Sequence, residues 1–237
     1  MIVLIGVDGS GKSTAARRLA QDLTAAGNPA RYFENAGGRP IIDALAHRLG
    51  CRDGRHLLGH RLHLAVEATI RWLAIARAIV VSTVTRRVAI MDRYTYCQYA
   101  LIRVRAAGAS GPSPGEDQPV PRNAAEPTRT DARVQGQRRS QAVHPATTPA
   151  ECLIRRLYSP FPGPDATFYL AVPPDEAARR VQLRGRDVED PLYLAAFAAA
   201  YRSLPEFPNW TLIDASTDAD SVAAAIQVAM AETSDTV

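Results

Sequence analysis

The chain has 237 residues, of which 46% are hydrophobic, and this is enough apolar material for the core of one globular domain. The net charge is +4, but the basic residues are spread among 24 acidic ones, which argues against a general nucleic-acid-binding protein. The longest apolar run is interrupted by Arg77, and the apolar amino terminus is too short for a signal peptide. We therefore expect a soluble cytoplasmic protein with neither nucleic acid nor membrane as a partner.

Short apolar runs alternate with segments of helical periodicity along the chain. We expect strands at 2–5, 30–33, 87–91, 165–172 and 210–213, and helices at 12–27 (with Gly27 as C-cap), 40–49, 55–84, 95–105, 151–158, 174–183, 191–204 and 221–230. Strands separated by helices predict an α/β fold of three α/β/α layers, with a parallel five-stranded sheet between helices. In such sheets, ligands bind at the carboxyl ends of the strands.

Residues 106–149 interrupt this pattern. The segment holds seven of the seventeen prolines and few large apolar residues, so it cannot bury enough surface to offset its ordering entropy. We expect a single domain over 1–237 that is interrupted by a disordered insert at 106–149.

A glycine-rich loop follows the first strand and precedes the first helix. Residues 6–13 (GVDGSGKS) match the pattern G-x-x-x-x-G-K-[ST], in which successive backbone N–H groups face phosphate oxygens. The positive end of the following helix favours the same anion. The pattern predicts an ATP site formed by Gly6, Asp8, Gly9, Ser10, Gly11, Lys12, Ser13 and Thr14. Lys12 is expected to reach the β- and γ-phosphates, and the Ser13 hydroxyl to bind Mg²⁺.

The lysine of this loop is the only lysine among 28 basic residues. The chain otherwise uses arginine, whose planar guanidinium suits a narrow phosphate cradle less well than a compact ammonium.

A second polar motif, Asp92-Arg93-Tyr94, follows the strand at 87–91. Asp92 is placed either to hold the magnesium shell or to cap the next helix, and Arg93 to bind a phosphate.

These motifs resemble the thymidylate kinase family over nearly the whole chain except 106–149. The resemblance rests on 6–14 (GVDGSGKST), 92–94 (DRY), 164–174 (PDATFYLAVPP) and 184–186 (RGR). It implies a mobile lid beside the sheet and transfer of the ATP γ-phosphoryl group to a nucleoside monophosphate, with dTMP the leading acceptor. It further implies that Arg93 holds the acceptor phosphate and that Arg184 and Arg186 close over the transferring group. The implied acceptor-binding residues are Asp8, Arg39, Glu67, Arg71, Arg93, Tyr94 and Gln98.

The departures from the family lie on the acceptor side. Residues 34–38 (ENAGG) lack the arginine and proline of the family's stretch after the second strand, and Glu67-Ala68 replaces its Asp-Arg. Arg71, one turn further along the same face, is a candidate replacement. Cys97 and Leu101 replace an expected serine and tyrosine, and Gly9 stands where one branch has a catalytic arginine. Phosphorylation is therefore better supported than thymidylate as its target.

Alternatives stay open. A nucleoside or other small-molecule kinase would use Asp8 or Glu34 as the base toward a hydroxyl, but Arg93 and Arg39 favour an acceptor that carries a phosphate. A GTPase of the Asn-Lys-x-Asp type is excluded, because Lys12 is the only lysine. A non-catalytic relative of these kinases remains a further hypothesis. A homodimer is also compatible with the sequence. We expect Arg179 and Arg180 to lie on a solvated helix face.

Overall fold

The computed structural model describes residues 1–35, 54–108, 147–185 and 189–234, without the side chains at 54–65, 67 and 233–234. The predicted helix at 40–49, the acceptor residue Arg39, the lid residue Arg186 and most of the 106–149 insert lie outside the described residues. So does the side chain of Glu67.

The described strands form one parallel sheet, as predicted. They are β1 (Ile2–Ile5), β2 (Ala30–Glu34), β3 (Val88–Asp92), β4 (Ala166–Ala171) and β5 (Thr211–Asp214), in the spatial order β2-β3-β1-β4-β5. The central strand β1 pairs Leu4 with Asp92 of β3 and with Phe168 of β4. The ends of β1 and β3 therefore meet at one edge of the sheet.

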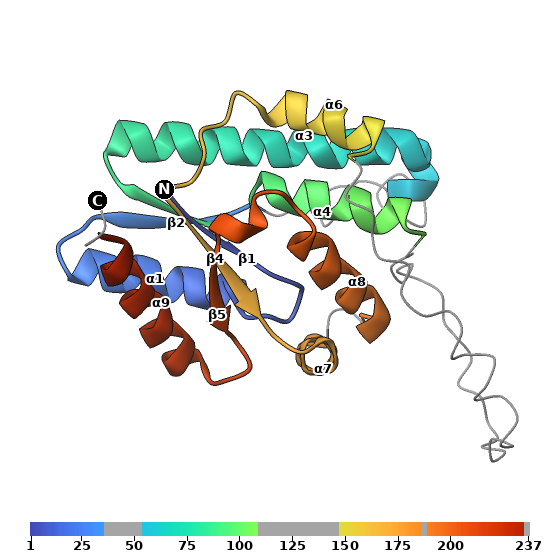
Figure 1. Ribbon diagram of the computed structural model, residues 1–237. Helices are drawn as coiled ribbons and strands as arrows, with labels where there is room; N and C mark the ends of the chain where they lie inside the picture. The colour runs from blue at the N-terminus through green and yellow to red at the C-terminus, as the bar shows by residue number, and fades with distance from the viewer. Residues whose placement is uncertain (36–53, 109–146, 186–188, 235–237) are drawn as a thin grey trace, which may run out of the picture.

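Helices cover both faces of this sheet. They are α1 (Lys12–Ala25), α3 (Gly54–Thr85), α4 (Thr95–Ala106), α6 (Pro149–Tyr158), α7 (Pro174–Leu183), α8 (Pro191–Arg202) and α9 (Ala219–Ser234), with a 3₁₀ turn at Phe207–Asn209. Alternate residues of β1 enter opposite cores: Ile2 and Leu4 pack with α1 and α9, whereas Val3 and Ile5 pack with α3, α4 and α8. Figure 1 shows α1 and α9 on one side of the strands and α3 with α4 on the other. The three-layer α/β/α prediction is confirmed.

The predicted boundaries need small corrections. Helix α1 ends at Ala25, and Gly27 lies just beyond the C-cap with φ 85, because Asn28 N–H donates to Leu23 O in a Schellman turn. The predicted insert is too long at both ends, because Ala106 is the last residue of α4 and Thr148 already caps α6 by accepting from Glu151 N–H at 3.2 Å. Pro149, counted with the insert, is the first residue of α6.

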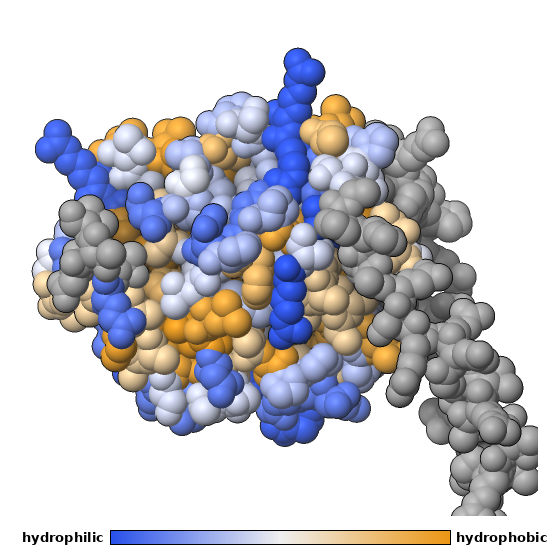
Figure 2. Space-filling model, in the orientation of Figure 1, coloured by the Kyte–Doolittle hydropathy of each residue, from blue (hydrophilic) through white to orange (hydrophobic). Residues whose placement is uncertain are grey.

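Helix α3 corrects the expectation that no segment is long and apolar enough for a membrane. Its stretch Ala68–Thr85 passes that test by length and composition, because the average over eighteen residues tolerates Arg71 and Arg77. In the structure this helix packs on the sheet through Ile75 and Ala78, while Leu73, Val80 and Val84 are exposed. In Figure 2 the molecular surface mixes projecting hydrophilic side chains with apolar residues between them.

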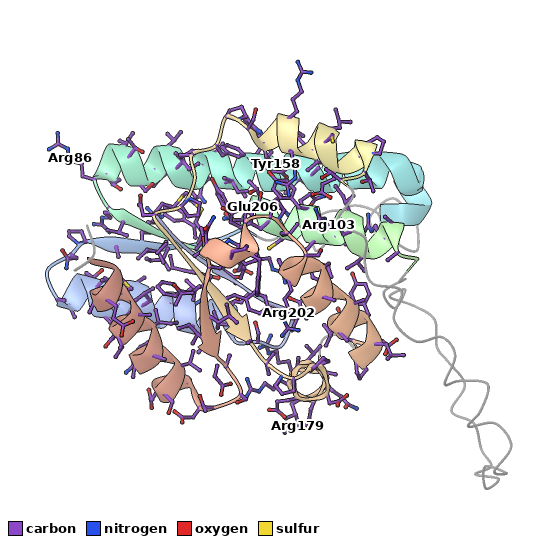
Figure 3. The ribbon with its side chains drawn as sticks, viewed as in Figure 1. Arg86, Arg103, Tyr158, Arg179, Arg202 and Glu206 are labelled. Carbon is purple, nitrogen blue, oxygen red and sulfur yellow. The ribbon has the colours of Figure 1, made fainter. Side chains whose placement is uncertain are left out.

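A buried ion-pair network joins α4, α6 and the region after α8. Arg103 donates to both carboxylate oxygens of Glu151, at 2.8 and 3.0 Å, and neither residue is exposed by more than 5%. Arg155 donates to Glu151 at 2.9 Å, forms an ion pair with Glu206, and lies 4.2 Å from the ring centre of Tyr99. Figure 3 shows Arg103 and Glu206 turned toward the interior of the molecule. The network ties the two chain segments on either side of 109–146 to each other.

Replacing Glu151 with glutamine is expected to destabilise the protein by about 3 kcal/mol, because Arg103 keeps a buried charge without its partner. Burial alone would raise the pKa of Glu151, but hydrogen bonds from Arg103 and Arg155 outweigh it and hold the pKa below the usual 4.5. The stabilisation from this group is therefore complete above about pH 4.5 and is lost on acidification through the lower folded-state pKa.

Thermal unfolding of the wild type and of E151Q between pH 3 and pH 7 checks this expectation. The difference in stability between the two proteins should shrink as the pH falls. The exposed pair of Arg18 and Asp22 provides the control, since D22N should change the stability little at any pH. If E151Q loses as much stability on acidification as the wild type does, the assignment of this pH dependence to Glu151 is contradicted.

Candidate functional site

The phosphate loop lies at the carboxyl end of β1, as the sequence predicts. Gly9 and Gly11 adopt φ values of 84 and 85, in the left-handed region that favours glycine. A Cβ at Gly9 would approach Ala177 O of α7 to 2.2 Å. The arginine that one branch of thymidylate kinases carries at this position therefore has no room here. A Cβ at Gly11 would meet nothing within 4 Å, so this side of the loop is open.

The amino end of α1 faces the same open side. Gly11 is its N-cap residue and offers no side-chain cap, and the first turn carries no acidic residue. The first N–H groups of a helix have no partners within the helix. Together with the helix dipole they form a site for an anion, which the loop glycines leave accessible.

Lys12 crosses back over the loop. Its side chain is 5% exposed, and Nζ donates a hydrogen bond to Val7 O at 2.6 Å. Nζ also lies 3.6 Å from Asp8 Oδ1. Burial lowers the pKa of Lys12, and the Asp8 carboxylate opposes that shift. The ammonium is thus held in place before any ligand binds.

Ser13 and Asp92 form a pair that suits a magnesium ion. Ser13 Oγ donates to Asp92 Oδ2, and Tyr32 OH lies 3.4 Å from the same oxygen. Asp92 is 3% exposed, and its other oxygen, Oδ1, is buried without a hydrogen-bond partner. A buried, unpaired carboxylate oxygen is costly unless a cation or water satisfies it. The donor set of a hydroxyl and a carboxylate fits Mg²⁺, which takes few protein ligands and keeps waters and substrate phosphates.

No cluster of three or more His, Cys, Asp or Glu side chains occurs among the described residues. That finding is compatible with the site, because a magnesium ion bound with a nucleotide needs only one or two protein ligands. Ser13 and Asp92 are the residues that would hold it, as the sequence predicts.

Replacing Asp92 with asparagine is expected to raise the Mg²⁺ concentration that half-saturates this site by about tenfold or more. The amide keeps the size of the side chain but removes the negative charge that the ion requires. The matched control is D214N, because Asp214 also ends a strand of the same sheet but is exposed and accepts from Ser216. Calorimetric titration with MgCl₂ measures both variants. An unchanged magnesium affinity in D92N would contradict the role of Asp92.

Arg93 has an unusual backbone. Its φ is 73, in the left-handed region, at an estimated cost on the order of 1–3 kcal/mol for a residue other than glycine. Its guanidinium forms an ion pair with Asp8, and the two side chains are 33% and 44% exposed. The Asp8 carboxylate raises the pKa of Arg93 above its usual value, against the effect of burial. Asp8, expected near the acceptor sugar or the magnesium shell, thus lies between Lys12 and Arg93.

Three further predicted acceptor residues lie in α3 (Arg71), at the N-cap of α4 (Tyr94) and within α4 (Gln98). Arg71 is 3% exposed, and Gln98 is 3% exposed with its Oε1 buried and unpaired. Tyr94 is buried, and its hydroxyl donates to Pro162 O at 2.5 Å, so that hydroxyl already has a partner in the protein. Burial also raises the pKa of Tyr94.

The predicted lid is described only in part. Arg184 caps the carboxyl end of α7 and is exposed. The structure does not show it in contact with the phosphate loop, and Arg186 lies outside the described residues.

A pocket beside the phosphate loop was missed by the sequence analysis. It has a volume of about 260 Å³ and lies between α1, α7 and the segment after β5. The side chains and backbone that line it belong to Ser10, Gly11, Thr14, Ala15, Arg18, Arg180, Ala215, Thr217, Ala219 and Val222. Because it adjoins the open side of Gly11, it continues the phosphate cradle outward.

Arg180 corrects the expectation of a solvated helix face. It donates to Glu176 at 2.7 Å, to Ala215 O at 2.8 Å and to Ser216 O at 2.9 Å, and so ties α7 to the segment after β5. Arg179 does match the expectation, since it is 62% exposed and projects outward from α7 (Figure 3). Glu176, four residues before Arg180, was the one local signal for this contact, because i,i+4 pairs fix a side chain on a helix.

The structure therefore gathers Asp8, Lys12, Ser13, Asp92 and Arg93 at one edge of the sheet. Comparison of the sequence with family models and with curated proteins finds no match. The function is argued below from the residues and their geometry.

Proposed function

We propose that the protein is an ATP-dependent nucleoside-monophosphate kinase similar to thymidylate kinase. The observation that carries the proposal is the pairing of two phosphate-binding cations across one carboxylate. Lys12 of the phosphate loop and Arg93 of the Asp92-Arg93-Tyr94 turn both contact Asp8. A donor phosphate at Lys12 and an acceptor phosphate at Arg93 would then be neighbours, as phosphoryl transfer requires.

The donor side supports ATP. The loop amides and Lys12 bind the β- and γ-phosphates, and the 260 Å³ pocket lined by Arg18 and Arg180 accepts the base. Ser13 and Asp92 would hold Mg²⁺, which when bound would neutralise charge on the phosphate oxygens.

The acceptor side supports a nucleotide. Arg93 exchanges the Asp8 carboxylate for the acceptor phosphate, since both are oxyanions that suit a guanidinium. An oxygen of that phosphate attacks the γ-phosphorus, and the bond from the γ-phosphorus to the β–γ bridging oxygen breaks to release ADP. Lys12 and Arg93, with Arg184 and Arg186 from a lid, stabilise the charge on the transferring group. Gln98 and Arg71 are the candidate readers of the base, with dTMP the leading acceptor.

The alternative of a nucleoside or other small-molecule kinase is less well supported. Such an enzyme needs a carboxylate that takes a proton from a hydroxyl. The Oδ1 oxygen of Asp8 already contacts two cations, Lys12 and Arg93, which occupy the position that a substrate hydroxyl would need. Glu34 is 58% exposed and lies 3.8 Å from Arg17 on the surface. The geometry favours an acceptor that brings its own phosphate. We further propose, as the sequence predicts, that the protein is a soluble, cytoplasmic enzyme of nucleotide synthesis.

A transfer assay tests the proposal. Labelled ATP and MgCl₂ are incubated with each common nucleoside monophosphate and each common nucleoside, and the products are separated by chromatography. We expect a labelled diphosphate, with dTMP the best acceptor. Transfer to nucleosides alone would support the alternative kinase, and no transfer to any acceptor by folded protein would support a non-catalytic relative.

A further inference from the structure

The segment after β2 is tied to the turn that carries Arg93. Asn35 follows Glu34, the last residue of β2, and is 1% exposed. Its backbone N–H donates to Asp92 O at 3.2 Å, which extends the pairing of β2 with β3 by one residue. Its side-chain Nδ2 donates to Arg93 O at 2.9 Å. A buried amide side chain is thus committed to the backbone of a residue at the candidate active site.

The backbone of Arg93 is held on both sides. Its N–H donates to Leu4 O of β1 at 3.1 Å, and its C=O accepts from Asn35 of the segment after β2. Between these two bonds the residue has φ 73. Among the described residues other than glycine, Arg86 is the second with a positive φ, and it lies in the exposed turn after α3. A conformation of this kind persists where surrounding contacts determine it.

The left-handed backbone sets the direction of the side chain. Changing φ from positive to negative rotates the Cα–Cβ bond of Arg93 relative to the sheet edge, and the guanidinium would no longer face Asp8. The bond from Asn35 therefore acts on the guanidinium through the backbone. The backbone N–H of Asn35 donates to Asp92 O without help from the side chain. A substitution at position 35 can therefore remove the side-chain bond to Arg93 O and keep the backbone bond to Asp92 O.

We propose that Asn35 is a positioning residue that holds Arg93 in its left-handed conformation and thereby presents the guanidinium toward Asp8. The proposal that this guanidinium binds the acceptor phosphate rests on the proposed function. The position of the guanidinium itself does not.

Two variants and one control test the role of Asn35. N35D keeps the size of the side chain but places a carboxylate against Arg93 O in place of a donor, and N35A removes the group altogether. The control is T24V in α1, because the side chain of Thr24 bonds to Ala30, the first residue of the same strand. Thr24 Oγ1 accepts from Ala30 N–H at 3.2 Å, so T24V also removes a bond between a side chain and the backbone of β2, but far from Arg93.

Crystal structures of the full-length wild type and the variants give the direct readout. We expect φ of Arg93 to become negative and its contact with Asp8 to be lost in N35D and N35A, and both to be retained in T24V. If N35D does not fold, N35A alone decides. A positive φ and an intact Arg93–Asp8 pair in the variants would overturn the proposal, whatever the substrate of the enzyme.

Steady-state kinetics with ATP and dTMP give the second readout. We expect the KM for dTMP in N35A to rise by about tenfold, as the loss of one buried hydrogen bond predicts, while the KM for ATP stays within about twofold. T24V should lower the unfolding temperature without changing either KM. Equal changes in both KM values would overturn the positioning role. A wild type that does not phosphorylate dTMP would count against the proposed function, and the crystal structures would still decide the role of Asn35.

Discussion

Replacing Lys12 with alanine will abolish phosphoryl transfer and leave the fold intact. The turnover number is expected to fall by about a thousandfold or more, because in the proposed reaction the ammonium stabilises charge that develops on the transferring group. The contacts of Lys12 with other described residues suggest no second role of similar importance. Its Nζ contacts Val7 O and Asp8, both within the phosphate loop. Transfer of label from ATP to dTMP measures the loss.

The stability of K12A should change little. Burial disfavours the charged form of Lys12, so removing the side chain also removes a desolvation cost. The comparison variant is K12R, which keeps the charge in a planar and larger group and should also lose most of its activity. Circular dichroism checks that both variants fold. Substantial transfer by folded K12A would show that the phosphate cradle is assigned wrongly.

Replacing Arg93 with alanine will raise the KM for the acceptor and lower turnover. The value of kcat/KM for the acceptor is expected to fall by about a hundredfold to a thousandfold, since in the proposed reaction one guanidinium serves both acceptor binding and the transition state. The KM for ATP should change little, because the proposal assigns donor binding to Lys12 and the loop amides. Kinetics with the acceptor varied at saturating ATP measure this effect.

The control for Arg93 is Arg86. It is also an arginine with positive φ, at 51, but it projects from the surface at the end of α3 (Figure 3). R86A therefore repeats the change in backbone preference and in net charge without touching the site, and should leave the kinetics unchanged. Acceptor kinetics in R93A that match those of R86A would refute the role of Arg93.

The sequence predicts the frame of the molecule well because that frame depends on local patterns. The loop at Gly6–Ser13 carries its own conformational demands, and the strand before it is a continuous apolar run of the kind that parallel sheets bury on both faces. Asp92 follows from the same logic, since a strand beside β1 brings its carboxyl end to the same edge. The sheet and the pairing of Ser13 with Asp92 could therefore be anticipated.

Contacts between distant segments could not be anticipated in the same way. The sequence predicts a surface position for Arg180, because its partners, the carbonyls of Ala215 and Ser216, lie 35 and 36 residues away in the chain. A backbone carbonyl has no sequence signal, since every residue carries one. The same holds for Asn35, whose side chain meets the carbonyl of Arg93. The ion pair of Arg103 with Glu151 also spans the segment 109–146, which separates them in the sequence.

Calorimetric titration of the full-length protein with ATP in the presence of MgCl₂ tests the central claim most directly, because it needs no knowledge of the acceptor. The account predicts saturable binding at one site in the wild type and a large loss of affinity in K12A. The absence of measurable binding to well-folded wild-type protein would contradict it.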